Sequence, residues 1–189
     1  NNLRNSGQPV VKITRDQWLK EAFEAEQSQS IVTARAIISE TLYEGIEDKN
    51  DKEENKKNWT DTADNFLANG AIECSRAMHL CICKELKDDI RAWMNAINLE
   101  EKHGNIKSQG KILQQALEAC NETELFYLIY AKHLWKKEKD IDKAIEVLQK
   151  GLSKITDEEE LYLAIIKLYK EKRMFDDTRK ILIKGRQIC

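Results

Sequence analysis

Five aromatic residues recur along this chain at a nearly constant spacing, and this recurrence limits the possible folds more than any other feature of the sequence. They are Trp18, Trp59, Trp93, Tyr127 and Tyr162, separated by 41, 34, 34 and 35 residues. A period near 34 residues is typical of antiparallel helix pairs that stack in series. We therefore expect an all-α chain, an α-α superhelix of about five helical hairpins in which these aromatics are the structural anchors.

Two further columns keep the register of the aromatic anchors. Gly70 and Gly104 stand at the same offset from Trp59 and Trp93, where the end of a helix commonly needs a residue with positive φ. Arginine likewise follows three anchors at one shared offset, at Arg35, Arg76 and Arg179. Because these arginines recur with the repeat, we expect structural pairing with carboxylates of their own or the adjacent unit. The alternative is a groove in which they hold an acidic partner.

A third column lies six positions beyond the arginine column and consists mostly of small residues: Thr41, Ile82, Ala116, Gly151 and Gly185. Glycine inside a helix costs roughly 1 kcal/mol relative to alanine. Its recurrence therefore indicates that neighbouring helices approach closely here. The fourth unit is one residue longer than the second and third, and we expect the extra residue in a loop over 136–140.

These registers divide the chain into an extended N-terminal tail and a repeat array. The tail covers residues 1–13, and the array covers 14–189 with units near 14–46, 59–87, 88–121, 122–155 and 156–189. Thr14 and Gln17 fit a capping box that opens the first helix. The chain lacks an initial Met and stops inside a helical pattern at Cys189, so we expect a piece of a longer protein.

The segment 47–58 interrupts the array between its first two units. It has no apolar residue and mixes both charge signs, which predicts a solvated, mobile loop. A docking loop is the alternative interpretation.

Charge and hydropathy exclude several classes of function. The net charge is −2, which gives no overall field that would attract nucleic acid or an anionic membrane. No apolar run approaches the roughly 18 residues needed to cross a bilayer. Five cysteines without a secretion signal indicate reduced thiols.

Four potential metal ligands fall close together in the sequence: Cys74, His79, Cys81 and Cys83. Residues two apart on a helix point to different sides, so Cys81 and Cys83 should diverge. We therefore expect packed side chains and no metal. His133, beside an apolar helix face, is expected to be packed or partly exposed. The sequence offers no catalytic triad and no phosphate-binding loop, so we predict neither an enzyme nor a cofactor.

Basic residues are densest on the last predicted helix, at Arg179, Lys180, Lys184 and Arg186. A solvated helix face is the simpler interpretation, and direct RNA contact is the alternative. The same segment carries Ile181, Leu182, Ile183 and Ile188. Because the end of a helical array needs a polar cap, we expect an exposed apolar edge that permits self-association.

A tryptophan on the first helix of a pair, with Arg-Ala opening the second, resembles the half-a-TPR (HAT) repeat. The matching positions are Trp18 with Arg35-Ala36, Trp59 with Arg76-Ala77, and Trp93 with Glu100-Glu101. The third and fourth units lack the arginine. Stretches 13–18, 59–64, 71–77 and 100–104 further resemble the Prp6 family of pre-mRNA-processing factors.

This resemblance implies a non-catalytic nuclear scaffold that bridges components of the U4/U6-U5 tri-snRNP and has spliceosomal proteins as partners. Two alternatives stay open. One is a TPR-like adaptor outside splicing, which would capture a peptide in a basic concave groove. The other is an RNA-binding platform. The sequence identifies no partner-binding residue.

Overall fold

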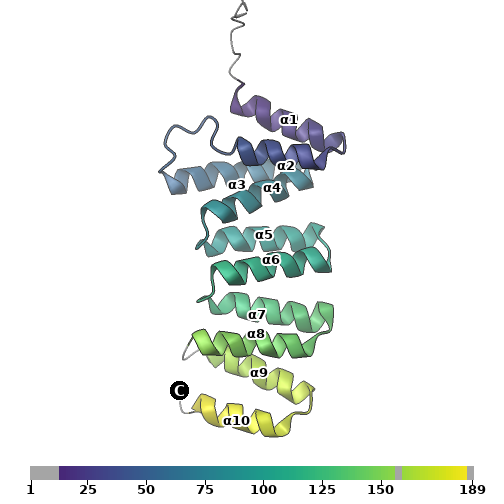
Figure 1. The fold of residues 1–189 in the computed structure, drawn as a ribbon, viewed down its shortest axis with the longest axis vertical. Coiled ribbons are helices and arrows are strands. Elements are labelled where there is room, and N and C mark those ends of the chain that lie inside the picture. The colour runs from purple at the N-terminus through teal and green to yellow at the C-terminus, as the bar shows by residue number, and fades with distance from the viewer. Residues whose placement is uncertain (1–12, 156–158, 187–189) are drawn as a thin grey trace, which may run out of the picture. The chain divides into compact units, whose positions relative to one another are not determined.

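The computed structural model describes residues 13–155 and 159–186, and every regular element in these ranges is a helix. The elements are α1 (Arg15–Gln27), α2 (Ile31–Glu40), α3 (Lys52–Ala68), α4 (Ile72–Glu85), α5 (Ile90–His103), α6 (Ile106–Ala119), α7 (Glu124–His133), the π-helical turn η1 (Leu134–Glu138), α8 (Ile141–Lys154), α9 (Glu159–Glu171) and α10 (Phe175–Arg186). Figure 1 shows how these helices follow one another along the chain. The predicted class, an all-α superhelix of helical hairpins, is confirmed.

The chain divides into two compact units, Asn1–Ile82 and Cys83–Cys189, with the division inside α4. In the first unit, α1 packs against α2. The predicted capping box at the start of α1 is confirmed, because Thr14 and Gln17 each accept a hydrogen bond from the other's backbone N–H. The expected tail lies outside the described residues except for Ile13.

Helix α4 is capped by a side chain from another helix. The buried carboxylate of Glu26, near the end of α1, accepts hydrogen bonds from the backbone N–H groups of Glu73 at 3.0 Å and Cys74 at 2.7 Å. These are orphan donors of the first turn of α4, and a negative charge there complements the helix dipole. The contact ties α1 to α4 across 47 residues of sequence.

The loop expected over 47–58 is wrong for residues 52–58, which form the first turns of α3. Asp51 is the N-cap, and its side chain accepts a hydrogen bond of 3.0 Å from the backbone N–H of Glu54. Glu53 and Glu54 place negative charge in the first turn, where the helix dipole favours it. Asn55 is buried and donates to the carbonyl of Asp48 at 3.0 Å. Capping therefore stabilises a helix that hydropathy alone does not predict.

The second unit is a regular succession of helices from α5 to α10, each packed against the next (Figure 1). Helix α7 lies in its interior and contacts α6, α8 and α9. Phe126 and Tyr127 on this helix are completely buried. None of the described helices is long and apolar enough to cross a membrane.

Four of the aromatic anchors are buried, namely Trp59, Trp93, Tyr127 and Tyr162, whereas Trp18 is half-buried. Three of them also donate to a backbone carbonyl that precedes their own helix. Trp59 donates to Leu42 at 3.0 Å, Trp93 to Lys87 at 2.8 Å, and Tyr127 to Asn121 at 2.8 Å. Each such anchor therefore fixes the connection between two hairpins as well as filling the core.

In four of the five hairpins, the turn between the two helices contains a residue with left-handed backbone, and only one of these residues is glycine. Positive φ occurs at Gln29 (62°), Gly70 (81°), Lys139 (62°) and Arg173 (60°), which lie at corresponding places between the two helices of their hairpins. The expectation for Gly104 is wrong, because its φ is −92°. Glycine is needed there for space, because a Cβ would lie 2.6 Å from the Glu100 carbonyl oxygen and would also meet the Glu100 carboxylate.

The extra residue of the fourth unit is not in a loop as expected. It is absorbed by η1, where Leu134–Glu138 form a π-helical turn that continues α7. A π-helical turn holds one residue more than an α-helical turn, and such turns are frequent at functional sites. Here the residues of the turn include Trp135 and two lysines, Lys136 and Lys137.

Candidate functional site

The arginine column is joined by one carboxylate in the first unit. Glu73 accepts hydrogen bonds from Arg35 of α2 and from Arg76 of its own helix, one on each carboxylate oxygen. Desolvation raises the pKa of Glu73, but the hydrogen bond from Arg35 and the charges of both arginines outweigh it. The pKa therefore lies below its ordinary value of 4.5. This arrangement links two hairpins and pairs both guanidinium groups with one carboxylate.

The last helix presents its basic residues to solvent. Arg179 is exposed and has no ion-pair partner in the described ranges. The Nζ of Lys180 lies 3.5 Å from Asp177 Oδ1. The same helix exposes Phe175, Leu182 and Ile183, as expected of an apolar edge. Ile188 and Cys189 lie outside the described residues.

The cysteine and histidine cluster is packed into the core. Cys74, His79, Cys81 and Cys83 are all buried, and burial raises the pKa of the Cys74 thiol and lowers that of the His79 imidazole. No group of three or more potential metal ligands occurs within residues 13–155 and 159–186. These side chains therefore act as core residues, and a protonated His79 is unfavourable in the folded state.

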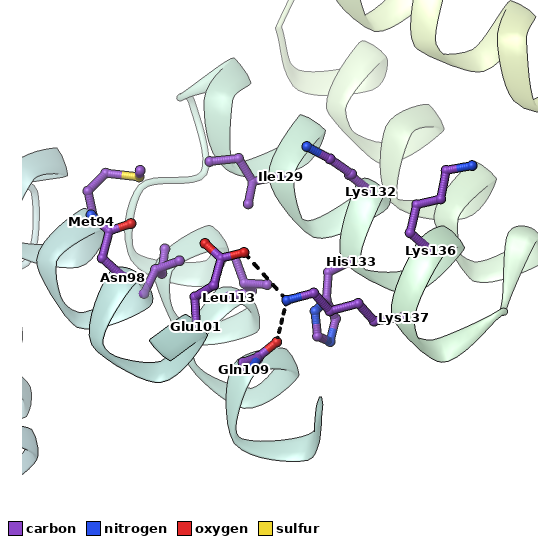
Figure 2. Close-up of a pocket in the computed structure, with 11 residues that line it drawn as sticks. Met94, Asn98, Glu101, Gln109, Leu113, Ile129, Lys132, His133, Lys136 and Lys137 are labelled. Carbon is purple, nitrogen blue, oxygen red and sulfur yellow. Dashed lines mark hydrogen bonds and ion pairs between the residues drawn. The ribbon is translucent and has the colours of Figure 1, made fainter. Parts of the chain in front are cut away.

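Two cavities open on the surface of the second unit, and α5, α7 and α9, the first helices of three successive hairpins, contribute to their linings. One cavity of about 250 Å³ lies between α5, α6 and α7. Its lining includes Met94 and Asn98 from α5, Leu113 from α6, and Ile129 and Lys132 from α7 (Figure 2).

A second cavity of about 380 Å³ lies between α7, α8 and α9 and shares Lys132 and Lys136 with the first. Leu128, Ala131, Leu148, Ala164 and Leu168 form its apolar part. Because the shared lysines stand between the two cavities, we treat them together as one groove, called the α7 groove below. The volumes of the two cavities lie near the lower end of the range for pockets that accept small ligands or single side chains.

Two lysines of the α7 groove lie beside the ring of Trp135. The Nζ of Lys136 lies 3.2 Å from the centroid of its ring, and the Nζ of Lys167 lies 5.3 Å away. The indole N–H donates to Glu171 Oε1 at 3.0 Å, which fixes the ring against α9. Both ammonium groups are therefore held beside one half-buried aromatic surface by cation–π attraction.

Four lysines around this ring have no carboxylate partner in the part of the chain that the structure describes: Lys132, Lys136, Lys139 and Lys167. Lys137 differs, because it contacts Gln109 Oε1 at 2.7 Å and Glu101 Oε1 at 3.5 Å (Figure 2). The groove therefore carries unpaired positive charge although the whole chain is slightly acidic.

The π-helical turn is held in place by a compact polar contact. His133 is buried, and its Nε2 lies 3.1 Å from Glu138 Oε1. Gly110 of α6 leaves the space for this pair, because a Cβ there would lie 2.8 Å from Glu138 Oε1 and 3.3 Å from His133 Nε2. Gly110 occupies the position that holds arginine in other units. Because this position holds glycine and not arginine, there is room for the π-helical turn that carries Trp135 and Lys136.

The lysines of the α7 groove were not predicted from the sequence, although a signal for them exists. Asn98, Lys132 and Lys167 each follow their anchor by five positions, so they form a column in phase with the repeat. Lys132, Trp135, Lys136 and Lys139 are spaced i, i+3, i+4, i+7, which would place them on one face of an uninterrupted α-helix. The densest basic run in the sequence lies instead on α10, where a solvated helix face was the simpler interpretation and RNA contact the alternative.

Comparison with known proteins gives the same repeat class. The model of the FAT domain matches residues 18–184. The chain is 34% identical over 108 residues to Pre-mRNA-splicing factor prp1 of Schizosaccharomyces pombe, covering 57% of this chain and 12% of that protein. It is 30% identical over 95 residues to human Pre-mRNA-processing factor 6, covering 50% of this chain and 9% of that protein. The chain therefore spans about a tenth of the length of these curated relatives.

Among solved structures, a crystal structure of MamA protein matches 90% of this chain and 89% of its own, with a TM-score of 0.50 and 13% identity. At that identity the likeness concerns the fold alone. The HAT-type repeats of this chain resemble a segment of the Prp6 family, as the sequence motifs indicated. Since the matching family model covers nearly all of the described residues, the chain belongs to the FAT domain family.

Proposed function

We propose that this chain is a non-catalytic protein-binding scaffold that acts in pre-mRNA splicing in the nucleus and holds components of the tri-snRNP together. The observation that carries the proposal is its similarity over 108 residues to a pre-mRNA splicing factor. The motifs that suggested the Prp6 family extend from residue 13 to residue 104, so they occupy several hairpins of the array.

The architecture supports a binding role. A helical-hairpin array exposes a long surface whose side chains repeat at regular intervals, which suits an extended protein partner. The α7 groove supplies such a surface with two adjoining cavities and unpaired charge. Its residues include no nucleophile activated by a neighbouring base, which is why the proposal is a scaffold and not an enzyme.

Affinity purification from nuclear extract tests this function. The tagged 189-residue chain is incubated with extract, and the recovered proteins are identified by mass spectrometry after chemical cross-linking. Recovery of tri-snRNP proteins, cross-linked directly to this chain, is the expected result. Recovery of abundant nuclear proteins without any component of the tri-snRNP would contradict the proposal.

A second measurement separates this function from direct RNA binding. The purification is repeated after nuclease treatment that removes the snRNAs. We expect the direct protein cross-links to survive, because the proposed contacts are between proteins. Loss of every cross-link on nuclease treatment would instead indicate that RNA tethers the chain.

A further inference from the structure

We infer that the α7 groove binds an acidic peptide segment of a partner protein, in which an aliphatic residue is flanked by aspartates or glutamates. This inference rests on the proposed protein-binding function and names the chemistry of the partner. It concerns the surface formed by Lys132, Trp135, Lys136, Lys139 and Lys167 above the apolar floor.

Charge complementarity identifies the occupant. Lys132 and Lys167 are exposed, occupy equivalent positions on α7 and α9, and lack carboxylate partners in the described ranges. These two helices contact each other directly, so the two ammonium groups belong to one continuous surface. A segment with carboxylates on either side of its central residue would meet both lysines, and each pair would raise specificity and association rate.

The floor of the groove identifies the central residue of that segment. Leu128, Ala131 and Leu168 line the larger cavity together with Leu148 and Ala164. An aliphatic side chain placed there removes apolar surface from water on both partners, which favours binding by roughly 25 cal/mol per Å² buried. A purely acidic segment would leave this floor unfilled.

The state of Trp135 favours a peptide over single-stranded RNA. Aromatic rings that bind single strands offer a free face on which a base can stack. Here Lys136 lies over the Trp135 ring and Lys167 approaches it, while the indole N–H is engaged by Glu171. The ring therefore positions the lysines, and the lysines are the groups that meet the ligand.

Fluorescence anisotropy with a synthetic peptide tests the inference on the full chain. The probe is a fluorescein-labelled Asp-Glu-Asp-Leu-Glu-Asp-Glu peptide, and its Asn/Gln counterpart is the uncharged control. We expect the acidic probe to bind and the uncharged probe to bind at least about tenfold more weakly. We also expect affinity to fall with added salt, because exposed charge pairs are screened.

Two matched double variants locate the site. Lys132→Glu with Lys167→Glu reverses charge in the groove, whereas Lys111→Glu with Lys150→Glu makes the same change in net charge on the second helices α6 and α8. All four lysines are exposed, and far-UV circular dichroism checks that both variants fold. We expect about a tenfold or greater loss of affinity for the groove variant and less than about twofold for the control.

Three results would overturn the inference: no binding of the acidic probe to the wild-type chain, equal losses in both double variants, or tighter binding of a poly(U) oligonucleotide that the groove variant abolishes. Nuclear purification with the groove variant separates the two proposals. If that variant retains every cross-linked tri-snRNP protein, the groove assignment fails and the scaffold function stands. If the wild-type chain binds the probe but recovers no tri-snRNP protein, the scaffold function fails and the groove assignment stands.

Discussion

The indole N–H of Trp59 donates a buried hydrogen bond of 3.0 Å to the carbonyl oxygen of Leu42, 17 residues earlier in the chain. The bond fastens α3 to the segment that follows α2, across the longest interval between two anchors. Trp93 and Tyr127 make the corresponding bond to a carbonyl six residues upstream. The anchors of this repeat are thus hydrogen-bond donors as well as core residues, and their polar atoms define where one hairpin joins the next.

Replacing Trp59 with phenylalanine should cost about 2–3 kcal/mol of unfolding free energy, because the buried Leu42 carbonyl loses its donor and a small cavity remains. Urea denaturation followed by circular dichroism measures the change. Trp18→Phe is the matched control, because Trp18 is half-buried and its indole N–H has no hydrogen-bond partner in the described ranges. Equal losses in the two variants would show that ring packing alone makes an anchor.

Replacing either of two helical glycines, Gly151 or Gly185, with alanine should change the unfolding free energy, but in opposite directions. At Gly151 a Cβ would lie 3.0 Å from the ring of Tyr127, which is fully buried and held by its hydrogen bond to Asn121. Overpacking of about 1–3 kcal/mol should therefore exceed the gain in helix propensity. At Gly185 a Cβ would lie 3.7 Å from Tyr162, an ordinary contact.

Gly185→Ala should accordingly stabilise the protein by about 0.5–1 kcal/mol, the propensity gain alone. Thermal denaturation of both single variants compares them directly. A stabilised Gly151→Ala variant would mean that Tyr127 moves freely and that the close approach is not a constraint.

The left-handed turn residues offer a separate route to higher stability. Gln29 has a φ of 62° and Arg173 a φ of 60°, conformations that cost a non-glycine residue about 1–2 kcal/mol. Glycine would relieve this strain but lose somewhat more chain entropy on folding. We expect Gln29→Gly and Arg173→Gly each to stabilise the protein by about 0.5–1 kcal/mol, measured by urea denaturation.

Gly70→Ala is the reverse experiment. Its φ is 81° and no atom lies within 4 Å of the added Cβ, so any loss reports backbone strain alone. We expect destabilisation of about 1 kcal/mol. An unchanged midpoint would show that this turn relaxes to another conformation.

Stability should fall as the pH drops below about 6.5, because burial lowers the pKa of His79 in the folded protein from its ordinary value of 6.5. The unfolded chain takes up a proton at this residue first, so acidification favours unfolding until the pH passes the lower, folded pKa. His79→Gln should flatten the dependence of melting temperature on pH in this window.

The pH range in which stability is lost distinguishes the contribution of His79 from that of Glu73. The pKa of Glu73 is lowered from 4.5, so the stability that it contributes is lost only below about pH 4.5. Proton NMR of the imidazole provides a direct check, and an imidazole that titrates at or above 6.5 would contradict the assignment. The His79→Gln variant should keep the wild-type loss of stability below about pH 4.5, because Glu73 is unchanged in it.

The sequence by itself determined the repeat. Aromatic anchors at a nearly constant spacing can bury their rings only if successive hairpins stack, so the all-α class and the helix pairs followed from that spacing. The motif around Trp59 and Arg76 also indicated the family. Local signals such as the Thr14 capping box were readable because a cap and its partner lie within one turn.

Only the tertiary structure decided where charge collects. Spacing alone did not show that Glu73 satisfies both Arg35 and Arg76, or that Lys132 and Lys167 lack such a partner in the described ranges, since ion pairing depends on the contacts between helices. Likewise a one-residue insertion enters a loop or a helix according to the space beside it. Gly110 leaves room for the His133–Glu138 contact, and the helix therefore absorbs the extra residue as a π turn. Repeat spacing fixes which residues are equivalent, whereas the packing of neighbouring hairpins fixes which of them remain available for a partner.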